Sequence, residues 1–242
     1  MDPDATGVLL VGLGRVTRLL RYLTDLPKSY EGEVVLGVGT STLDSSGEVV
    51  AEWDMSSVAL EEVRAAAAGF VGSIMQVPPM VSAVKVGGRR LHALARAGEE
   101  VERPARPVTV HRLSVGPAVA AAVFPIEVDC SSGTYIRSLA ADIGVALGGG
   151  AHLRNLRRTA IGSFGLADAV PLDSVGPDHV LDSAESLRDY PSAVVDAAAA
   201  DDVSHGRRIA AAFEGPWRVL DSAGGLLAVY EGERAAVVLT PA

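Results

Sequence analysis

The sequence predicts an α+β fold, in which a mixed, mainly antiparallel sheet is flanked by helices and followed by a small β-rich domain. Three observations support this fold class. Hydrophobic residues make up 48% of the 242 residues, enough for a sizeable packed core. Two runs of strand length, 108–115 and 121–130, are joined by a short connection and are expected to pair as an antiparallel hairpin. The last forty residues alternate between short apolar runs and turn residues, which is typical of a small β-rich domain.

The N-terminal region is expected to form a strand, a helix and a second strand. Residues 7–13 are apolar throughout and predict a buried strand. Residues 15–24 predict a helix, because their apolar side chains recur at helical spacing and would share one face. Residues 30–38 alternate well enough for a half-exposed strand, and the sequence Asp-Ser-Ser-Gly at 44–47 predicts a turn.

The middle of the chain is expected to contain three helices. Residues 57–70 and 134–147 predict two of them, each with its first residue, a serine or a threonine, as the N-cap. The stretch 75–88 contains two adjacent prolines and two adjacent glycines, so it is expected to be irregular. A short helix should follow over 89–97 and end at a glycine.

The sequence changes character near residue 165. Before that point, 152–158 is expected to be helical and 160–164 to form a strand. An acidic connecting segment is expected over 166–201, and the small β-rich domain over 202–242. Its apolar runs, separated by turn residues, place the expected strands at 217–220, 226–230 and 236–239.

Composition excludes several classes of protein. The single cysteine, Cys130, rules out an internal disulfide and a cysteine-cluster zinc site, and it is expected to be a buried strand residue. The five histidines are scattered, so no metal site is expected. The sequence has no run of 18 apolar residues and no charged-then-apolar leader. These features predict a cytoplasmic protein without a membrane span.

The charge is distributed unevenly along the chain. A net charge of −9 at first sight opposes a nucleic-acid partner. Residues 165–205, however, hold nine acidic residues and one arginine, which accounts for nearly all of the excess. Residues 82–112 hold seven lysines or arginines against three glutamates. Because local patches decide contacts with phosphates, this basic segment keeps an RNA partner possible.

One motif suggests a dinucleotide. An expected strand, a G-x-G sequence and an expected helix follow one another over 8–20, which is how a dinucleotide-binding turn begins. The third glycine position holds Thr17, and the next expected strand does not end in a clear ribose-binding acid. A nicotinamide-binding oxidoreductase is therefore the weaker alternative.

Five segments carry the stronger signal, and they occur in one order along the chain. They are DPDATG at 2–7, KSY at 28–30, QVPPMVSAVK at 76–85 with GGRRL and ARAG beyond it, CSSGTYIRSL at 130–139, and GAHL, LRRT and GSF between 150 and 164. Together they resemble the TruB-type tRNA pseudouridine synthases. The resemblance spans residues 2 to about 170 and is most specific at 130–139.

The resemblance implies a pseudouridine synthase-like catalytic domain over 1–165, with a thumb-like insertion at 76–106, and a PUA-like C-terminal domain. Asp2 would be the catalytic carboxylate and Arg137 its ion-pair partner. A neighbouring guanidinium keeps a carboxylate ionised in a desolvated pocket.

The resemblance also implies the residues that meet the substrate. Tyr30 would pack against the target base, and Tyr135 and Lys28 would belong to the same pocket. The thumb-like insertion would bind the T stem-loop of tRNA through basic side chains. These are Lys85, Arg89, Arg90, Arg96 and Arg106.

The reaction implied is the isomerisation of uridine 55 in the T loop of tRNA, after the base is flipped out of the loop. It requires one ionised carboxylate, which attacks the sugar or base or removes a sugar proton; the sequence leaves both routes open. No cofactor and no metal are expected, and neither is a protein partner, so the protein should be a monomer. A catalytically impaired protein of the same fold that binds RNA or assists tRNA folding is the main alternative.

The start of the chain raises a separate expectation. Met1 stands where the family has the leucine of L-D-P-x-A-T-G, and the family carries a few tens of residues before that motif. We therefore expect the chain to lack the family's N-terminal segment and to be weakly active or inactive, because a chain end frays unless something holds it.

Overall fold

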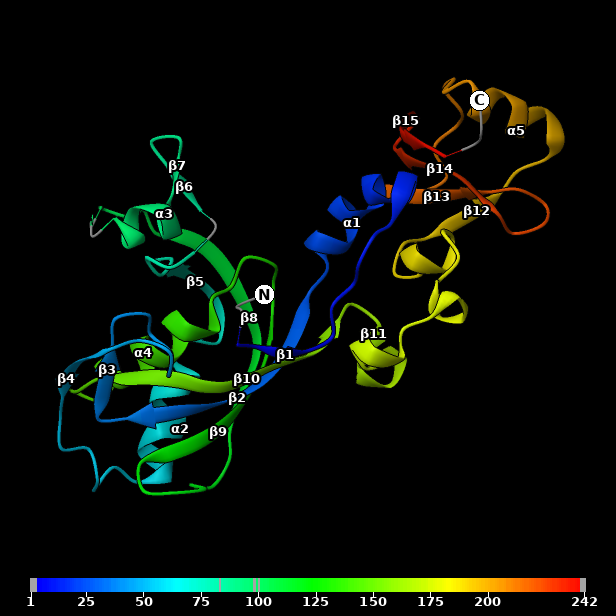
Figure 1. Cartoon of the computed structure of the whole chain (residues 1–242). Coiled ribbons are helices and arrows are strands. Elements are labelled where there is room, and N and C mark those ends of the chain that lie inside the picture. Colours follow the sequence, from blue (N-terminus) through cyan, green and yellow to red (C-terminus); the bar gives the residue numbers. More distant parts are fainter. Residues whose placement is uncertain (1–3, 83, 98, 100, 240–242) are drawn as a thin grey trace. The chain divides into compact units, whose positions relative to one another are not determined.

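The computed structural model describes residues 4–82, 84–97, 99 and 101–239 (Figure 1). The chain forms two compact units. The first consists of the chain up to Val8 and of Pro27–Ile161, and the second consists of Leu9–Leu26 and the chain from Gly162 onward. The expected boundary at 165/166 lies close to the second of these division points, whereas the helical segment near the N-terminus groups with the C-terminal unit.

The first unit is built on a curved sheet in the order β1-β10-β2-β9-β8-β5. These strands are β1 (Thr6–Gly7), β10 (Ala151–Ile161), β2 (Lys28–Leu36), β9 (Val123–Cys130), β8 (Arg106–Val115) and β5 (Gly72–Gln76). The pair β1–β10 is parallel and the other neighbours are antiparallel. The predicted mixed, mainly antiparallel sheet is thus confirmed, as is the β8–β9 hairpin.

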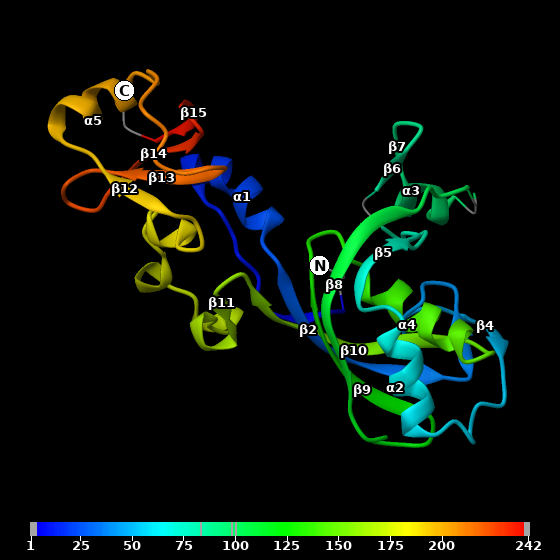
Figure 2. The same ribbon diagram turned by 180° about the vertical axis from the view of Figure 1, so that it is seen from behind.

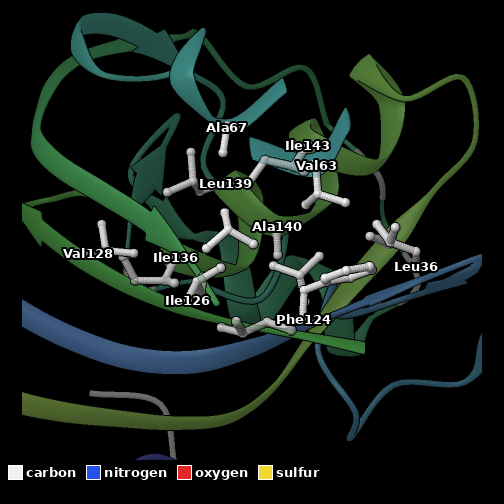
Figure 3. Packing of buried hydrophobic residues seen from close by; sticks show 14 of the residues in the cluster. Leu36, Val63, Ala67, Phe124, Ile126, Val128, Ile136, Leu139, Ala140 and Ile143 are labelled. Carbon is white, nitrogen blue, oxygen red and sulfur yellow. The ribbon is translucent and has the colours of Figure 1, made fainter. Parts of the chain in front are cut away.

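Two helices, α2 (Leu60–Ala68) and α4 (Ile136–Ala146), lie side by side against the sheet (Figure 2). Their apolar side chains pack with those of the strands in one core, in which Figure 3 labels Val63 and Leu139 of the helices and Phe124 of β9. This core fixes the first turn of α4 over the sheet.

Shorter elements complete the first unit. The strands β3 (Val38–Thr40) and β4 (Val49–Glu52) pair with each other. The expected thumb contains the two-residue strands β6 (Lys85–Val86) and β7 (Arg89–Arg90), which form a hairpin before the helix α3 (Leu91–Arg96).

The second unit contains the expected small β-rich domain. Its sheet has the order β12-β13-β14-β15, made of β12 (Ser192–Val194), β13 (Pro216–Leu220), β14 (Leu226–Glu231) and β15 (Arg234–Val238). The 3-10 helix η1 (Gly14–Leu19) and α1 (Leu20–Asp25) pack on it through Leu19 and Tyr22.

Between residues 162 and 205 the chain forms short elements. Besides β12, they are β11 (Phe164–Gly165), the 3-10 turns η2 (Leu166–Asp168), η3 (Leu172–Ser174), η4 (Pro177–His179) and η5 (Glu185–Leu187), and the helix α5 (Ala197–Ser204). No helix in the described part of the chain is long and apolar enough to cross a membrane.

Two sequence predictions of secondary structure are wrong. Residues 8–13, expected in a buried strand, lie outside the described strands, and Leu9, Val11 and Leu13 are exposed. The short strand β1 pairs with β10 only at Thr6 and Gly7, and the chain then leaves the sheet. The sequence did not show this, because a continuous apolar run has no alternation that would distinguish buried from exposed positions. Residues 152–158, expected to be helical, belong to β10.

The reason for the second error is a bulge. Asn155 has a φ of 54°, and the pairing of β10 with β2 shifts between Arg154 and Arg157. The extra residue brings Leu153 and Leu156, three apart in sequence, against the same core. Two apolar residues at i and i+3 imitate the spacing of a helix.

Both predicted N-caps are also wrong. Helix α2 begins at Leu60, and the Glu62 carboxylate accepts a hydrogen bond from the backbone N–H of Ala59 at 2.8 Å. Helix α4 begins at Ile136, and the hydroxyl of Thr134 donates to the carbonyl of Ser131 at 3.0 Å.

Candidate active site

A pocket of about 140 Å³ opens in the first unit where β2, β10 and the start of α4 meet. Its lining residues are Tyr30, Thr134, Tyr135, Ile136, Arg137, Leu156 and Arg158. The structure therefore brings together three residues that the sequence motifs singled out, Tyr30, Tyr135 and Arg137. Leu156 and Arg158, from the LRRT segment, were not predicted to be site residues.

A second pocket of about 150 Å³ shares part of this wall. Its lining residues are Asp4, Ala5, Asp44, Ser45, Arg137, Leu153, Arg154, Asn155 and Leu156. The expected catalytic residue, Asp2, lies outside the described residues. Asp4, two positions further along, borders this second pocket, and Arg137 borders both.

Arg137 is the buried centre of the site. Its side chain is 4% exposed. Its guanidinium donates to the carbonyl of Thr42 at 3.0 Å and to that of Val81 at 2.9 Å. It also forms an ion pair with Asp44, with 3.2 Å between Nη1 and Oδ2. These contacts tie the first turn of α4 to the turn after β3 and to the base of the thumb.

Asp44 was missed as a site residue by the sequence interpretation. Partial burial acts to raise the pKa of Asp44, but hydrogen bonds from Ser46 and Thr42 act against it. The charge of Arg137 acts in the same direction as these hydrogen bonds, and the pKa of Asp44 lies below its ordinary value of 3.8. Asp44 is therefore ionised at neutral pH. The only signal in the sequence was a turn motif, which does not reveal a partner on a distant helix.

Gln76 fixes the backbone beside Arg137. Its side-chain amide donates to the carbonyl of Tyr135 at 3.0 Å and accepts from the N–H of Tyr135 at 2.7 Å. The hydroxyl of Ser138 donates to the carbonyl of Val77 at 2.9 Å. The end of β5 thus holds the start of α4, and Gln76 is 2% exposed.

Arg158 connects the pocket to the N-terminal loop. Its Nε donates to the carbonyl of Val8 at 2.8 Å, and its carbonyl accepts from the N–H of Val8 at 2.9 Å. A Cβ at Gly7 would overlap the carbonyl of Arg158, so only glycine permits this close approach. The chain that follows the DPDATG segment is therefore anchored on β10.

Lys28, expected in the substrate pocket, begins β2 two residues before Tyr30 and is not among the described residues that line either pocket. Its carbonyl accepts a hydrogen bond from Sγ of Cys130 at 3.7 Å. Burial raises the pKa of the Cys130 thiol to about 11, so this cysteine is protonated at neutral pH and unreactive.

The basic residues expected to bind tRNA lie mostly on the surface. Arg89, Arg90 and Arg106 are exposed, and Arg89 forms a two-bond ion pair with Glu99 at 2.9 and 3.0 Å. The side chains of Lys85 and Arg96 lie outside the described part of the chain.

The structure does not support the nicotinamide-binding alternative that the G-x-G sequence suggested. A dinucleotide-binding turn requires a strand before the G-x-G sequence. In the described chain, residues 8–13 form no strand, and Gly14 begins a 3-10 helix. The described residues also contain no group of three histidine, cysteine or acidic side chains that could hold a metal ion.

Comparisons with known proteins agree with the motifs. The family model described as "TruB family pseudouridylate synthase (N terminal domain)" matches residues 1–136, and the one described as "tRNA pseudouridylate synthase B C-terminal domain" matches 137–195. The chain belongs to the TruB family of pseudouridine synthases.

Relatives named tRNA pseudouridine synthase B support the same assignment. The protein of Mycobacterium sp. (strain KMS) is 43% identical over 254 residues, covering 100% of this chain and 85% of the relative. That of Symbiobacterium thermophilum is 48% identical over 213 residues, covering 85% and 70%.

Solved structures share the fold at lower identity. A Cbf5-Nop10-Gar1 complex matches with a TM-score of 0.73 and 23% identity, covering 99% of this chain and 74% of that one. An H/ACA RNP bound to a substrate RNA containing 2'-deoxyuridine matches with a TM-score of 0.71 and 20% identity, covering 100% and 74%. At this identity the match shows a pseudouridine synthase fold.

Proposed function

We propose that this protein isomerises uridine 55 in the T loop of tRNA to pseudouridine, with the flipped base held in the pocket between Tyr30 and Leu156. The observation that carries the proposal is the convergence of Tyr30, Tyr135 and Arg137 on one pocket from separate segments of the chain. Tyr30 offers a flat apolar face, and stacking a base on an aromatic ring contributes about 1–3 kcal/mol. That gain offsets part of the unstacking of the target base, which costs a few kcal/mol.

The chemistry we propose needs one carboxylate and no cofactor. The bond between C1′ and N1 of the uridine breaks, the uracil turns, and a bond forms between C1′ and C5. The proton on C5 then leaves and N1 takes up a proton, so the product is an isomer of uridine. Asp2 is the carboxylate, acting either as a nucleophile or as the base that removes a sugar proton. Asp4, two positions after Asp2 in the sequence, borders the second pocket together with Arg137, and this supports the proposal.

Arg137 acts on that carboxylate through its charge. A guanidinium close to a carboxylate stabilises the ionised form in a site shielded from water. Because two carbonyls and Asp44 hold Arg137, its position does not depend on the substrate. A preorganised charge of this kind requires little rearrangement during the reaction.

The test is a single-turnover assay with tRNA transcripts carrying tritium at C5 of uridine, since tritium release reports the loss of the C5 proton. We expect release from wild-type tRNA, none from a transcript with cytidine at position 55, and none with Asp2→Asn. Asp4→Asn, two positions further along the sequence, is the matched control and should retain turnover. Binding of tRNA without tritium release by the wild-type protein would instead support the RNA-binding alternative.

A further inference from the structure

Arg158 lies beside the proposed base platform. It is directly opposite Tyr30 in the antiparallel pairing of β10 with β2, so both side chains stand on the same face of the sheet. Cβ atoms of such opposite residues lie about 4.5–5.5 Å apart. Both residues line the first pocket, and Arg158 is 7% exposed.

The other arginines of β10 differ from Arg158 in one respect. Arg154 pairs with Glu33 at 2.5 Å, and Arg157 pairs with Glu31 at 3.3 Å, and both side chains are partly exposed. Within the residues that the structure describes, no carboxylate pairs with Arg158. The most buried arginine of this strand is therefore the one without an anionic partner there.

The hydrogen-bonding capacity of Arg158 is also incompletely used. A guanidinium carries five N–H donors, and the one on Nε bonds to the carbonyl of Val8. For the four donors on the terminal nitrogens, the described residues provide no acceptor. The terminal nitrogens of Arg158 are not among the described side-chain atoms that are buried without a partner, so they are accessible from the pocket that Arg158 lines, where a ligand can supply the counter-charge.

The geometry points to a backbone phosphate of the RNA as that ligand. We propose that the terminal nitrogens of Arg158 bind a non-bridging oxygen of a phosphate flanking the flipped uridine. The two carbonyl groups of uracil are neutral, whereas each flanking phosphate carries a full negative charge and accepts the paired N–H bonds of a guanidinium. This inference rests on the proposed function, because it assumes that the flipped uridine occupies the pocket.

The same guanidinium would then join two parts of the reaction. Its Nε holds Val8, six positions after the proposed catalytic residue Asp2 in the sequence, while its terminal nitrogens hold the nucleotide. A lysine has no Nε donor and no planar fork, so Arg158→Lys would keep the charge without the geometry.

The experiment changes the phosphate as well as the protein. T stem-loop RNAs receive a neutral methylphosphonate on the 5′ or the 3′ side of the target uridine, with a phosphorothioate at the same place as the charged control. We expect the methylphosphonate at one of these two positions to weaken binding by wild-type protein by roughly ten- to a hundredfold, as for a hydrogen bond to a charged group. A methylphosphonate in the distal stem and the phosphorothioates should have little effect.

Variants then assign the effect to Arg158. Arg158→Met should weaken binding of unmodified RNA by a similar factor, lower the slope of log K against log salt by about 0.7–0.9, and be insensitive to the methylphosphonate. Arg157→Met, the neighbouring control, should remain sensitive to it. Arg158→Lys should recover part of the salt slope and little of the turnover.

Three outcomes would overturn the inference or the function beneath it. If wild-type protein binds both flanking methylphosphonate RNAs as tightly as unmodified RNA, the phosphate contact does not exist. This measurement uses the wild-type protein alone, so it does not depend on whether a variant folds. If the effects of Arg158→Met and of the methylphosphonate multiply, another group binds the phosphate. If unmodified RNA yields no pseudouridine, the proposed function fails, whatever the phosphate does.

Discussion

Arg137 is held in the pocket wall by the carbonyls of Thr42 and Val81 and by the carboxylate of Asp44. Among these three, only Asp44 carries a charge. Removing one member of a buried ion pair leaves the other charge poorly compensated, which is more damaging than losing a surface pair. Asp44 is therefore the residue at which stability and the geometry of the pocket are most directly coupled.

We predict that Asp44→Asn lowers the free energy of unfolding by about 1–3 kcal/mol and reduces turnover more than tRNA affinity. Asparagine keeps an oxygen for the hydrogen bonds from Thr42 and Ser46 but removes the charge beside Arg137. Urea denaturation and single-turnover kinetics measure the two effects.

Asp54 provides a matched control for this variant. It accepts hydrogen bonds from the N–H and hydroxyl of Ser56, as Asp44 does from Ser46. Unlike Asp44, it is exposed and forms no ion pair with the arginines that the structure describes. Asp54→Asn should leave stability almost unchanged, because the side chain is fully exposed. Equal effects of the two substitutions would mean that the ion pair with Arg137 contributes nothing.

The contribution of Asp44 should also depend on pH. Its pKa in the folded protein lies below 3.8, so its stabilising effect is fully present above that value and is lost as the pH falls through the folded pKa. The difference in unfolding free energy between wild type and Asp44→Asn should be constant from pH 5 to 7 and shrink below about pH 3.8. Denaturation curves at a series of pH values test this, and a difference that grows on acidification would contradict it.

The residues of the site divide into those the sequence could reveal and those it could not. Tyr30, Tyr135 and Arg137 lie in short motifs, so they were found, although their roles remain predictions. Asp44 lies in none of the motifs and acts through an ion pair with α4, a distant part of the chain. Gln76 lies in the motif at 76–85, but its hydrogen bonds to the backbone of Tyr135 were not predicted. Such contacts depend on the packing of the whole sheet, which no local pattern specifies.

Strand β10 shows the same limit for a whole element. Its bulge at Asn155 breaks the alternation expected of a strand, and this is why the sequence suggested a helix there. The predicted strands of the β8–β9 hairpin and of the C-terminal sheet were confirmed, because apolar runs and turn residues mark them clearly. The bulge at Asn155 made the strand look like a helix in the sequence, and it also directs the side chain of Leu156 toward both pockets.

We predict that the bulge tolerates glycine and rejects a β-branched residue at position 155. Asn155→Gly should keep stability within about 1 kcal/mol, since glycine adopts a positive φ readily, although the bond from Nδ2 to Glu33 is lost. Asn155→Val should lower the unfolding free energy by about 1–3 kcal/mol and reduce turnover by displacing Leu156. Thermal denaturation and the tritium-release assay compare them, and indistinguishable variants would show that the bulge does not position Leu156.

For the molecule as a whole, the acidic net charge and an RNA substrate are compatible because the charges are segregated along the chain. The excess of acidic residues lies at 165–205, whereas the exposed arginines of the thumb lie in the basic stretch 82–112. In the structure Arg89 is paired with Glu99, with both side chains about half exposed. An exposed pair of this kind contributes little to stability, so a phosphate can replace the glutamate.

We therefore predict that replacing Arg89, Arg90 and Arg106 together with Gln weakens tRNA binding and lowers the slope of log K against log salt by about 2.1–2.7, since each of the three lost phosphate contacts removes about 0.7–0.9. Glu99→Gln should act in the opposite direction and tighten binding, because it removes the anion that competes for Arg89. Arg64→Gln, on the exposed side of α2, is the control for a change of charge alone and should leave the slope unaltered. Filter binding of tRNA at several salt concentrations measures all three variants. If the triple variant keeps the wild-type slope, these arginines do not contact phosphates. If Glu99→Gln weakens binding, the ion pair between Arg89 and Glu99 stabilises the RNA-bound thumb and does not compete with the RNA.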